Sequence, residues 1–223
     1  MKIFDNINNI VKDDLKTTIT KNSKLSVAAA CFSIYAFEEL KEQLQDIDEL
    51  NFIFTSPTFI KERELKEKRE FYIPQLNRER SLYGTEFEIK LRNELSQKAI
   101  AKECAEWIRE KVKFKSNTTN EQMGGFVNVV GEEQLTYFPI NGFTTTDLGS
   151  ERGNNLVNFV SKIDAPNSEK YINVFQEIWQ DNKRLKDVTD QVIENISNVY
   201  KENSPDFIYF LTLYNIFNEF LEA

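Results

Sequence analysis

The stretch Lys24–Cys31 reads KLSVAAAC and consists almost entirely of small and apolar side chains. It shows no polar face at helical spacing, which is typical of a central strand buried on both sides of a sheet. After it, Tyr35–Ile47 carries apolar residues at helical spacing, and Leu50–Phe54 is a second short apolar run that ends before a Ser-Pro pair. Strand, helix and strand within about thirty residues predict a βαβ unit, with parallel strands and a right-handed crossover.

Further elements flank this unit on both sides. The first twenty residues have apolar side chains at helical spacing and predict an amphipathic helix, and Glu86–Lys111 shows the longest helical pattern of the chain. Val112–Lys115 alternates as an edge strand does. Phe126–Val130 and Gln134–Ile140 have the composition of two strands, joined by a Gly-Glu-Glu hairpin connection.

The last third of the chain, from Asn155 onward, has a helical pattern. The whole chain therefore predicts an α/β domain over residues 1–166, a mixed sheet with helices on both faces, followed by a helical C-terminal subdomain over 167–223. Ser204-Pro205 is typical of a helix entry, and the helix predicted after it is apolar almost all round. Such a helix is buried, either in the core of this domain or against a further domain if the natural chain continues past Ala223.

The chain contains no histidine. This excludes Ser-His-Asp and Cys-His triads, His-ligated metal sites and phosphohistidine chemistry. The net charge of -8 argues against a nucleic-acid coat protein or a polybasic membrane binder. Cys31 and Cys104 lack disulfide or CxxC spacing, which favours free thiols in a reducing compartment. Because a signal peptide and a bilayer-length apolar run are both missing, we predict a cytoplasmic protein without membrane contact.

Two common phosphate-binding motifs are absent from the sequence. No glycine is followed by lysine, as a GxxxxGK[ST] loop requires, and none of the seven glycines forms a GxGxxG pattern. We predict no catalytic residue and no metal site. The alternative is a nuclease that uses a divalent cation, with Glu86, Glu88 and Lys90 supplying carboxylates and a lysine. A solvated helix face is the simpler interpretation, because this spacing spreads the side chains around a helix.

Positive charge gathers in the middle of the chain. Lys61–Lys115 holds 15 Lys or Arg against 11 acids, so the remaining residues carry a net charge of -12. Lys61, Arg63, Arg78 and Arg80 are candidate nucleic-acid contacts, because cations bind phosphates and the aromatic rings between them stack on bases. Glutamates alternate with these cations, however, and that pattern is also typical of a salt-bridged exposed face.

An unusual polar stretch, INGFTTTDLGSERGNN, starts at Ile140. Asn141, Gly142, Thr144 and Thr145 are candidates for binding an anion or a phosphate, because hydroxyl and amide side chains beside glycine present several donors. The alternative is a polar connection between a strand and a helix, whose own backbone is capped by these side chains.

Several longer segments carry a family resemblance. KLSVAAACFSIYAFEEL followed by LNFIFTSPTF, and the late strand that leads into GFTTTDLGSERGNN, are similar to a phospholipase D-like domain. YIPQLNRERSLYGTEFEIKLRNEL, PINGFTTTDLGSERGN and NSPDFIYFLTLYNIFNEFLE resemble the N-terminal region of large bacterial superfamily 2 helicases. In those proteins a phospholipase D-like module precedes a DEAD/DEAH-type or Snf-type motor.

The resemblance implies a phospholipase D-like fold that has lost its catalysis. That superfamily uses the histidine of an H-x-K element on a late strand; here Asn128 stands near that position and no lysine follows. The remaining feature is the loop with Asn141, Gly142, Thr144 and Thr145 at positions resembling a phosphate-binding site. The implied function is a non-catalytic module that positions DNA, a partner chain or the motor of an ATP-dependent helicase or translocase.

The resemblance also bears on cofactors and partners. It implies no cofactor in this segment, whereas ATP and Mg²⁺ belong to the downstream motor domains of the same chain. A homodimer is implied as well, because single-motif members of the superfamily pair across their active sites. A protein-interaction module without affinity for nucleic acid is a further alternative.

Overall fold

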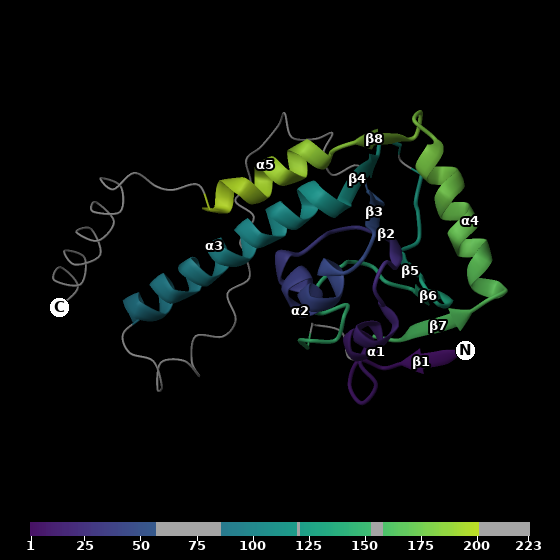
Figure 1. Ribbon diagram of the computed structural model, residues 1–223, viewed down its shortest axis with the longest axis horizontal. Coiled ribbons are helices and arrows are strands. Elements are labelled where there is room, and N and C mark those ends of the chain that lie inside the picture. The colour runs from purple at the N-terminus through teal and green to yellow at the C-terminus, as the bar shows by residue number, and fades with distance from the viewer. Residues whose placement is uncertain (57–85, 120, 153–157, 201–223) are drawn as a thin grey trace.

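The computed structural model describes residues 1–56, 86–119, 121–152 and 158–200, with the side chains of the long helix described from residue 95 (Figure 1). These residues form an eight-stranded mixed sheet in the order β1-β7-β6-β5-β2-β3-β4-β8. The strands β2, β3 and β4 are parallel, and the other neighbouring pairs are antiparallel. The strands are β1 (Lys2–Phe4), β2 (Lys24–Ala29), β3 (Glu49–Phe54), β4 (Val112–Asn117), β5 (Phe126–Val130), β6 (Gln134–Phe138), β7 (Val160–Asp164) and β8 (Leu185–Asp187).

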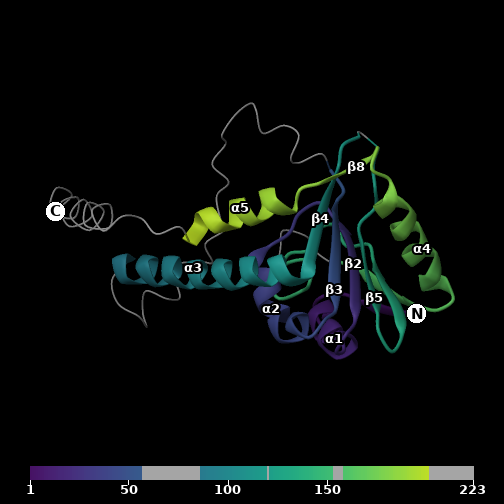
Figure 2. The same ribbon diagram turned by 45° about the horizontal axis from the view of Figure 1, so that its top comes forward.

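Helices cover both faces of the sheet, but unequally. Of the described helices, α1, α2 and α3 lie on one side of the sheet and α4 alone covers the other (Figure 2). The helices α3 and α5 lie side by side and extend away from the sheet (Figure 1). The helices are α1 (Val11–Thr18), α2 (Ile34–Gln45), α3 (Glu86–Lys111), α4 (Asn167–Gln180) and α5 (Thr189–Tyr200). The fold is therefore α/β, with a mixed sheet flanked by helices, as the sequence predicts.

The predicted βαβ unit is confirmed. β2 and β3 are parallel, with Ala29 opposite Phe54, and α2 connects them. The helix starts after Ser33, whose side-chain oxygen accepts the N–H of Tyr35 at 3.2 Å. This bond satisfies one of the backbone donors that a helix leaves free at its first turn. The predicted hairpin is confirmed as well, because β5 and β6 pair in antiparallel fashion across the three-residue connection at 131–133.

The first twenty residues differ from the single helix that their spacing predicts. Lys2–Phe4 forms β1, which pairs with β7, and α1 begins only at Val11. Between these elements Asp5 accepts the backbone N–H groups of the second, third and fourth residues after it, and Asn6 has a φ of 53°. Such local bonds compete with helical bonds, and a left-handed residue interrupts a helix. The helical spacing of the isoleucines therefore spans two different elements.

Two strands occur where the sequence predicts only helix, so that prediction is wrong at β7 and β8. β7 joins β6 to β1, and β8 pairs with β4. Because β8 lies outside it, β4 is an interior strand and not the edge strand that its alternation suggests. One polar position of β4 is explained by α4: the Lys115 ammonium donates to the Trp179 carbonyl at 2.8 Å and lies 4.8 Å from the centroid of the Trp179 ring. The helix predicted after Pro205 lies outside the described residues.

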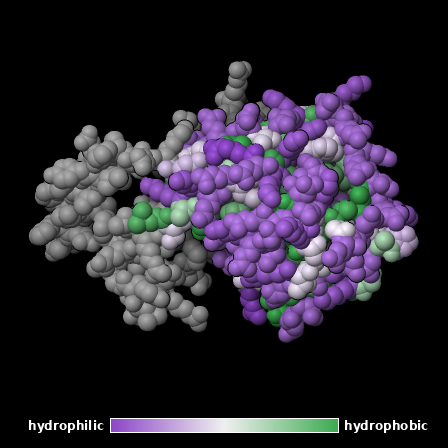
Figure 3. All heavy atoms as spheres, in the orientation of Figure 1, coloured by the Kyte–Doolittle hydropathy of each residue, from purple (hydrophilic) through white to green (hydrophobic). Residues whose placement is uncertain are grey.

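The two faces of the sheet bury different amounts of apolar surface, because alternate residues of a strand point to opposite sides. The main core lies under α1, α2 and α3, and its sheet residues include Leu25, Val27, Phe52 and Phe114. The α4 face holds a smaller cluster, formed by Ala28, Ile53, Phe126, Phe175 and Leu185. Most of the described surface visible in Figure 3 is hydrophilic. Among the described helices, none has both the length and the apolar run that a membrane-spanning segment needs.

Candidate functional site

Several strands begin or end at one edge of the sheet, which we call the carboxyl edge because the parallel strands β2, β3 and β4 end there. β5 and β8 are antiparallel to these strands and begin at the same edge, and β6 returns to it. The predicted anion-binding loop follows β6 and therefore lies at the carboxyl edge. In α/β sheets, ligands bind beyond the carboxyl ends of parallel strands, so this edge is the candidate site of the fold.

The loop is fastened to the segment that follows β2. The Ala30 N–H donates to the Asn141 carbonyl at 2.8 Å, and the Phe143 N–H donates to the Cys31 carbonyl at 2.9 Å. The Ser33 N–H donates to the Phe143 carbonyl at 3.0 Å, which continues a short parallel ladder. The loop therefore has a defined backbone position beside the first turn of α2.

Phe143 anchors the loop in the main core. Its side chain is buried, and its ring stacks on Phe32 with the ring centroids 5.9 Å apart. Phe32 contacts Phe52 and Phe114 edge-on, at centroid distances of 5.8 and 5.3 Å. Edge-on and stacked ring pairs of this kind add to the stabilisation that burial supplies. The position of the loop is therefore determined by its one aromatic residue more than by its polar residues.

The donors of the loop point at a carboxylate of the loop itself. The Thr144 hydroxyl donates to the Asp147 carboxylate at 2.6 Å and accepts the Asp147 N–H at 3.1 Å. The Gly142 N–H donates to the same carboxylate. Burial raises the pKa of Asp147, and these hydrogen bonds from Thr144 and Gly142 oppose the rise. The sequence predicts that these donors bind a phosphate. In the structure they bond the Asp147 carboxylate instead.

The other two predicted residues have different partners. The Thr145 hydroxyl donates to the Glu151 carboxylate at 3.3 Å. The exposed Asn141 makes no side-chain hydrogen bond within the described part of the chain and contributes its backbone carbonyl. A Cβ on Gly142 would lie 2.7 Å from the Cys31 sulfur and 2.9 Å from an Asp147 oxygen, so a larger residue there would displace one or both of these side chains. The structure brings Gly142 and Thr144 together around one carboxylate, as a self-capped loop.

Negative charge dominates the surroundings of this loop. Burial raises the pKa of Cys31, and the neighbouring charge of Asp147 raises it further. Burial likewise raises the pKa of Tyr35, with a smaller contribution from Glu151. Both thiol and phenol are therefore neutral near pH 7, and the two carboxylates oppose the approach of an anion.

Asn128, which stands near the expected histidine position, lies in the interior of β5 and is fully buried. Its side-chain oxygen accepts the Thr136 hydroxyl of β6 at 2.8 Å. This bond joins two neighbouring strands within the sheet, whereas the loop begins beyond the end of β6. Asn128 and the loop residues therefore have no hydrogen bond in common.

Two groups of sequence-predicted residues cannot be placed in the site. Lys61, Arg63, Arg78 and Arg80 lie outside the described residues. Glu86, Glu88 and Lys90 belong to the first turns of α3, so the predicted helix is confirmed, but their side chains lie outside the described part. Among the side chains that are described, no three His, Cys, Asp or Glu gather closely enough to hold a metal ion.

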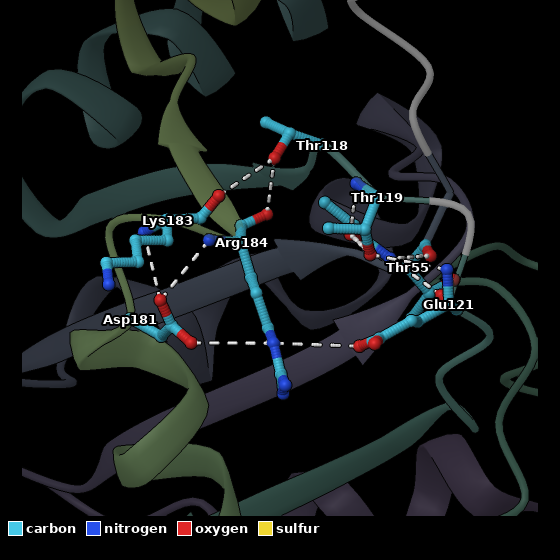
Figure 4. A network of polar contacts seen from close by, with 8 residues as sticks. Thr55, Thr118, Thr119, Glu121, Asp181, Lys183 and Arg184 are labelled. Carbon is cyan, nitrogen blue, oxygen red and sulfur yellow. Dashed lines mark hydrogen bonds and ion pairs between the residues drawn. The ribbon is translucent and has the colours of Figure 1, made fainter.

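The carboxyl edge also holds a polar network that sequence reasoning did not single out (Figure 4). Asn117, at the end of β4, donates to the carbonyls of Thr55 and Glu121 at 3.2 and 2.9 Å. Its side-chain oxygen accepts the N–H and the hydroxyl of Thr119, both at 2.8 Å. Asn117 therefore ties the ends of β3 and β4 to the turn that follows. The run SNTTNE in the sequence was the signal for such a turn, since Asn and Thr side chains often bond the nearby backbone.

The same network joins β4 to the segment before β8. The backbone N–H and the hydroxyl of Thr118 both donate to the Arg184 carbonyl, at 2.8 and 2.9 Å. The Arg184 guanidinium lies 3.6 Å from Glu121 and 3.5 Å from Asp181 (Figure 4). These groups are largely exposed, so the ion pairs add little stability. They place Arg184, and the exposed Lys183 next to it, at the carboxyl edge.

The fold and this edge define a class of protein, an α/β protein whose loops gather at the carboxyl ends of three parallel strands. Models of known protein families do not match this chain, and a search of curated proteins finds no relative of it.

Proposed function

We propose that this chain is a non-catalytic module with a phospholipase D-like fold, and that it forms the N-terminal part of a larger ATP-dependent DNA helicase or translocase. In that role it positions nucleic acid or the motor domains of the same polypeptide. The mixed sheet with helices on both faces supports the proposal at the level of the fold. The absence of histidine from the whole chain supports the loss of phospholipase D chemistry.

The observation that carries the proposal is the make-up of the carboxyl edge. Its loops are held in defined positions by their own hydrogen bonds, and the chain has no histidine to act as the nucleophile. Such an edge can hold a ligand without converting it by the phosphohistidine route. The exposed Lys183 lies at this edge, where its ammonium can contact a phosphate of nucleic acid, whereas the neighbouring Arg184 is already paired with Glu121 and Asp181.

The basic segment of the sequence adjoins the same edge along the chain. β3 ends at Phe54, and the Thr55 N–H donates to the Ala29 carbonyl at 3.0 Å. The sequence reaches Lys61 and Arg63 shortly after this point. We infer that the nucleic-acid contacts combine this segment, through Arg78 and Arg80, with Lys183 at the carboxyl edge. ATP and Mg²⁺ belong to the motor, since this chain has no GxxxxGK[ST] motif to hold a nucleotide.

Retention of DNA at different salt concentrations tests the proposal. We expect labelled single- or double-stranded DNA to shift in mobility without cleavage when Mg²⁺ or Mn²⁺ is present. Binding should weaken steeply with salt, because each neutralised phosphate releases counterions. Charge reversal by Arg78→Glu with Arg80→Glu should weaken retention, whereas Lys16→Glu in the last turn of α1 should change it little. Unchanged retention in the Arg78/Arg80 variant at low salt would favour the protein-interaction alternative.

Cleavage of the DNA would favour the nuclease alternative instead. In that case Glu88→Ala should abolish cleavage, and this result would overturn the proposal. The matched control is Glu103→Ala, a glutamate further along the same helix that pairs with Lys41. A nuclease would keep its activity after this second change.

The loop can be tested separately from the basic residues. Asp147→Asn removes the charge that lies among the donors of Gly142 and Thr144 but keeps an acceptor for them. If the loop binds a phosphate of the DNA, this variant should bind severalfold more tightly than the wild type. Unchanged binding would mean that the loop is only a self-capped connection, which is the arrangement seen in the structure.

The parent protein and its assembly need two further observations. The reading frame after Ala223 should encode a GxxxxGK[ST] element and a DExx box, and a stop codon there would contradict the helicase proposal.

Light scattering on the purified chain should give the mass of a homodimer if modules pair as the resemblance implies. A monomeric mass would contradict that pairing alone.

A further inference from the structure

A groove lies between α4 and the sheet, on the face opposite the main core. Its volume is about 400 Å³, within the range of small-molecule sites. Lys24 and Glu49, the first residues of β2 and β3, line it. The groove is therefore at the edge of the sheet where the parallel strands begin, away from the carboxyl edge. Neither the loop nor the polar network described above contributes to it.

A row of polar side chains crosses the central strands beneath α4, and its members Ser26 and Asn51 form part of the floor of the groove. Ser26 of β2 lies opposite Asn51 of β3, and both line the groove. Asn128 of β5 lies opposite Ser26 on its other side, and Thr136 follows on β6. Residues opposite each other in neighbouring strands point to the same face, so this row faces α4. A row of hydroxyl and amide groups replaces the apolar residues that usually fill the space under a helix.

One atom of this row lacks a partner. The Asn128 side chain is fully buried, its oxygen accepts the Thr136 hydroxyl, and its side-chain nitrogen has no hydrogen bond. If the amide is turned over, its oxygen becomes the unpaired atom instead. Buried polar groups without a partner are rare in folded proteins, and each one calls for a ligand, a bound water or another explanation.

The walls of the groove offer many more unused polar groups. The side chains of Ser26, Asn51, Gln134 and Gln176 make no hydrogen bond within the described part of the chain. Amide side chains donate and accept at once, as a hydroxyl group of a ligand also does. The groove thus presents paired donors and acceptors and not a single kind of charge.

The charges around the groove exclude an anion. The Lys24 ammonium lies 3.3 Å from Asp48 and 3.2 Å from Glu49, so its charge is already compensated. Glu169 of α4 lines the groove and makes no ion pair within the described residues. The excess of negative charge disfavours a phosphate, while carboxylates readily accept hydrogen bonds from hydroxyl groups. Trp179 adds apolar surface beside these groups.

We propose that this groove binds a small, uncharged, hydroxyl-rich molecule, a monosaccharide or a related polyol. Its hydroxyls exchange hydrogen bonds with Asn51, Gln134 and Gln176, and donate to Glu169. This site is independent of the function proposed for the carboxyl edge, and either can fail without the other.

Ligand-observed NMR on the full chain tests this site, with glucose, ribose, glycerol and myo-inositol as probes. At least one of these should give saturation transfer from the protein, and its phosphorylated counterpart should bind about tenfold more weakly or not at all. Gln176→Leu, on the exposed side of α4, should weaken binding of the positive probe about fivefold or more. Asn51→Leu on the floor should weaken it further. The matched control is Gln45→Leu, an exposed amide at the end of α2 on the other face, which should leave binding unchanged.

The variants must first be shown to fold, by circular dichroism and a cooperative thermal transition. If Asn51→Leu does not fold, Gln176→Leu still tests the groove, because this side chain is solvent-exposed. The proposal is overturned if no neutral probe binds, if phosphorylated probes bind equally well, or if Gln176→Leu and Gln45→Leu have the same effect.

Discussion

The two faces of the sheet are built from the same strands but have opposite chemical character. Under α1, α2 and α3 the strands present Leu25, Val27, Phe52 and Phe114, all buried in one continuous apolar cluster. Under α4 the same strands present the polar row that begins at Ser26, together with a small apolar cluster around Phe126. The first face is packed for stability, because burial of apolar surface is the main favourable contribution to folding.

The two faces of the sheet therefore have different roles: one supplies stability and the other can bind a ligand. The apolar face forms the main core, and protein cores are close-packed. The α4 face keeps hydroxyl and amide groups half-buried beside a groove, which weakens packing but leaves groups free for recognition. Stability should therefore depend mainly on one face and ligand binding on the other.

The largest expected effect is on the apolar face. Phe114→Ala removes a fully buried ring that contacts Phe32, Phe52 and Phe54, and should lower the free energy of unfolding by about 3–5 kcal/mol. Phe126→Ala makes the same chemical change on the α4 face and should cost at least about 1 kcal/mol less, because the space around it can relax. Urea denaturation of the two variants measures the difference. Equal losses would contradict the unequal packing of the two faces.

The next effect concerns Asp14 of α1, which ties the apolar face to the outer strands. Its carboxylate accepts Tyr137 at 2.7 Å, Lys162 at 2.8 Å and Lys2 at 2.7 Å. Burial alone would raise the pKa of Asp14, but the hydrogen bonds from Lys162, Lys2 and Tyr137 outweigh it and hold the pKa below its ordinary value. Asp14→Asn should cost about 1–3 kcal/mol at pH 7, as expected for hydrogen bonds to a charged group.

The same carboxylate makes stability depend on pH. Because its folded pKa lies below the unfolded value, its contribution is complete above the unfolded pKa and is lost as the pH falls through the folded pKa. Thermal unfolding of the wild type and of Asp14→Asn between pH 7 and pH 2 should therefore converge toward acid pH. If the difference in stability between the two proteins stays constant with pH, Asp14→Asn destabilises the protein by changing its packing and not by removing a charge.

An effect of the same order is expected for the polar row on the α4 face. Thr136→Val alone leaves the Asn128 amide with no partner at all and should cost about 1–3 kcal/mol. The double variant Asn128→Leu with Thr136→Val removes both partners and should change stability by less than about 1 kcal/mol. A double-mutant cycle measured by chemical denaturation gives the coupling between them. Additive losses would mean that the Asn128 and Thr136 side chains are not coupled, which would contradict the hydrogen bond as the cause of the loss.

The smallest effect is expected at the rim of the groove. Gln176→Leu should change the free energy of unfolding by less than about 0.5 kcal/mol, because its side chain is exposed and makes no hydrogen bond within the described residues. The measurement is the denaturation midpoint beside that of Gln45→Leu on the opposite face. A loss as large as that of a core variant would show that this side chain holds α4 to the sheet.

The comparison of the faces also shows where the sequence is informative. KLSVAAAC and LNFIF predict β2 and β3 correctly, because a strand buried on both faces is recognisable from its composition alone. The same reasoning missed β1, β7 and β8, which are short and depend on partners distant in sequence. It also took β4 for an edge strand, since Lys113 and Lys115 alternate with apolar residues, although Lys115 contacts α4 and the second half of β4 pairs with β8.

The candidate site was predictable only in outline. The donors Gly142 and Thr144 were recognisable from a polar stretch rich in glycine and threonine. Asp147 accepts their hydrogen bonds only because the polar stretch turns back on itself beside the segment that follows β2. The sequence does not specify this turn. Asn117 and Arg184 were not singled out, because they are 67 positions apart and meet only through the pairing of β4 with β8.

The sequence by itself determined which chemistry is possible and which local elements form. The absence of histidine is independent of any fold, and the strand–helix–strand unit follows from the spacing of apolar residues, which sets local backbone hydrogen bonds. Only the tertiary structure decided which donor faces which acceptor. Three features depend on strand register: the hydrogen bonds of the loop to its own carboxylate, the carboxyl edge with Asn117 and Arg184, and the polar row under α4. Register is set by the packing of the whole sheet and not by neighbours in the chain.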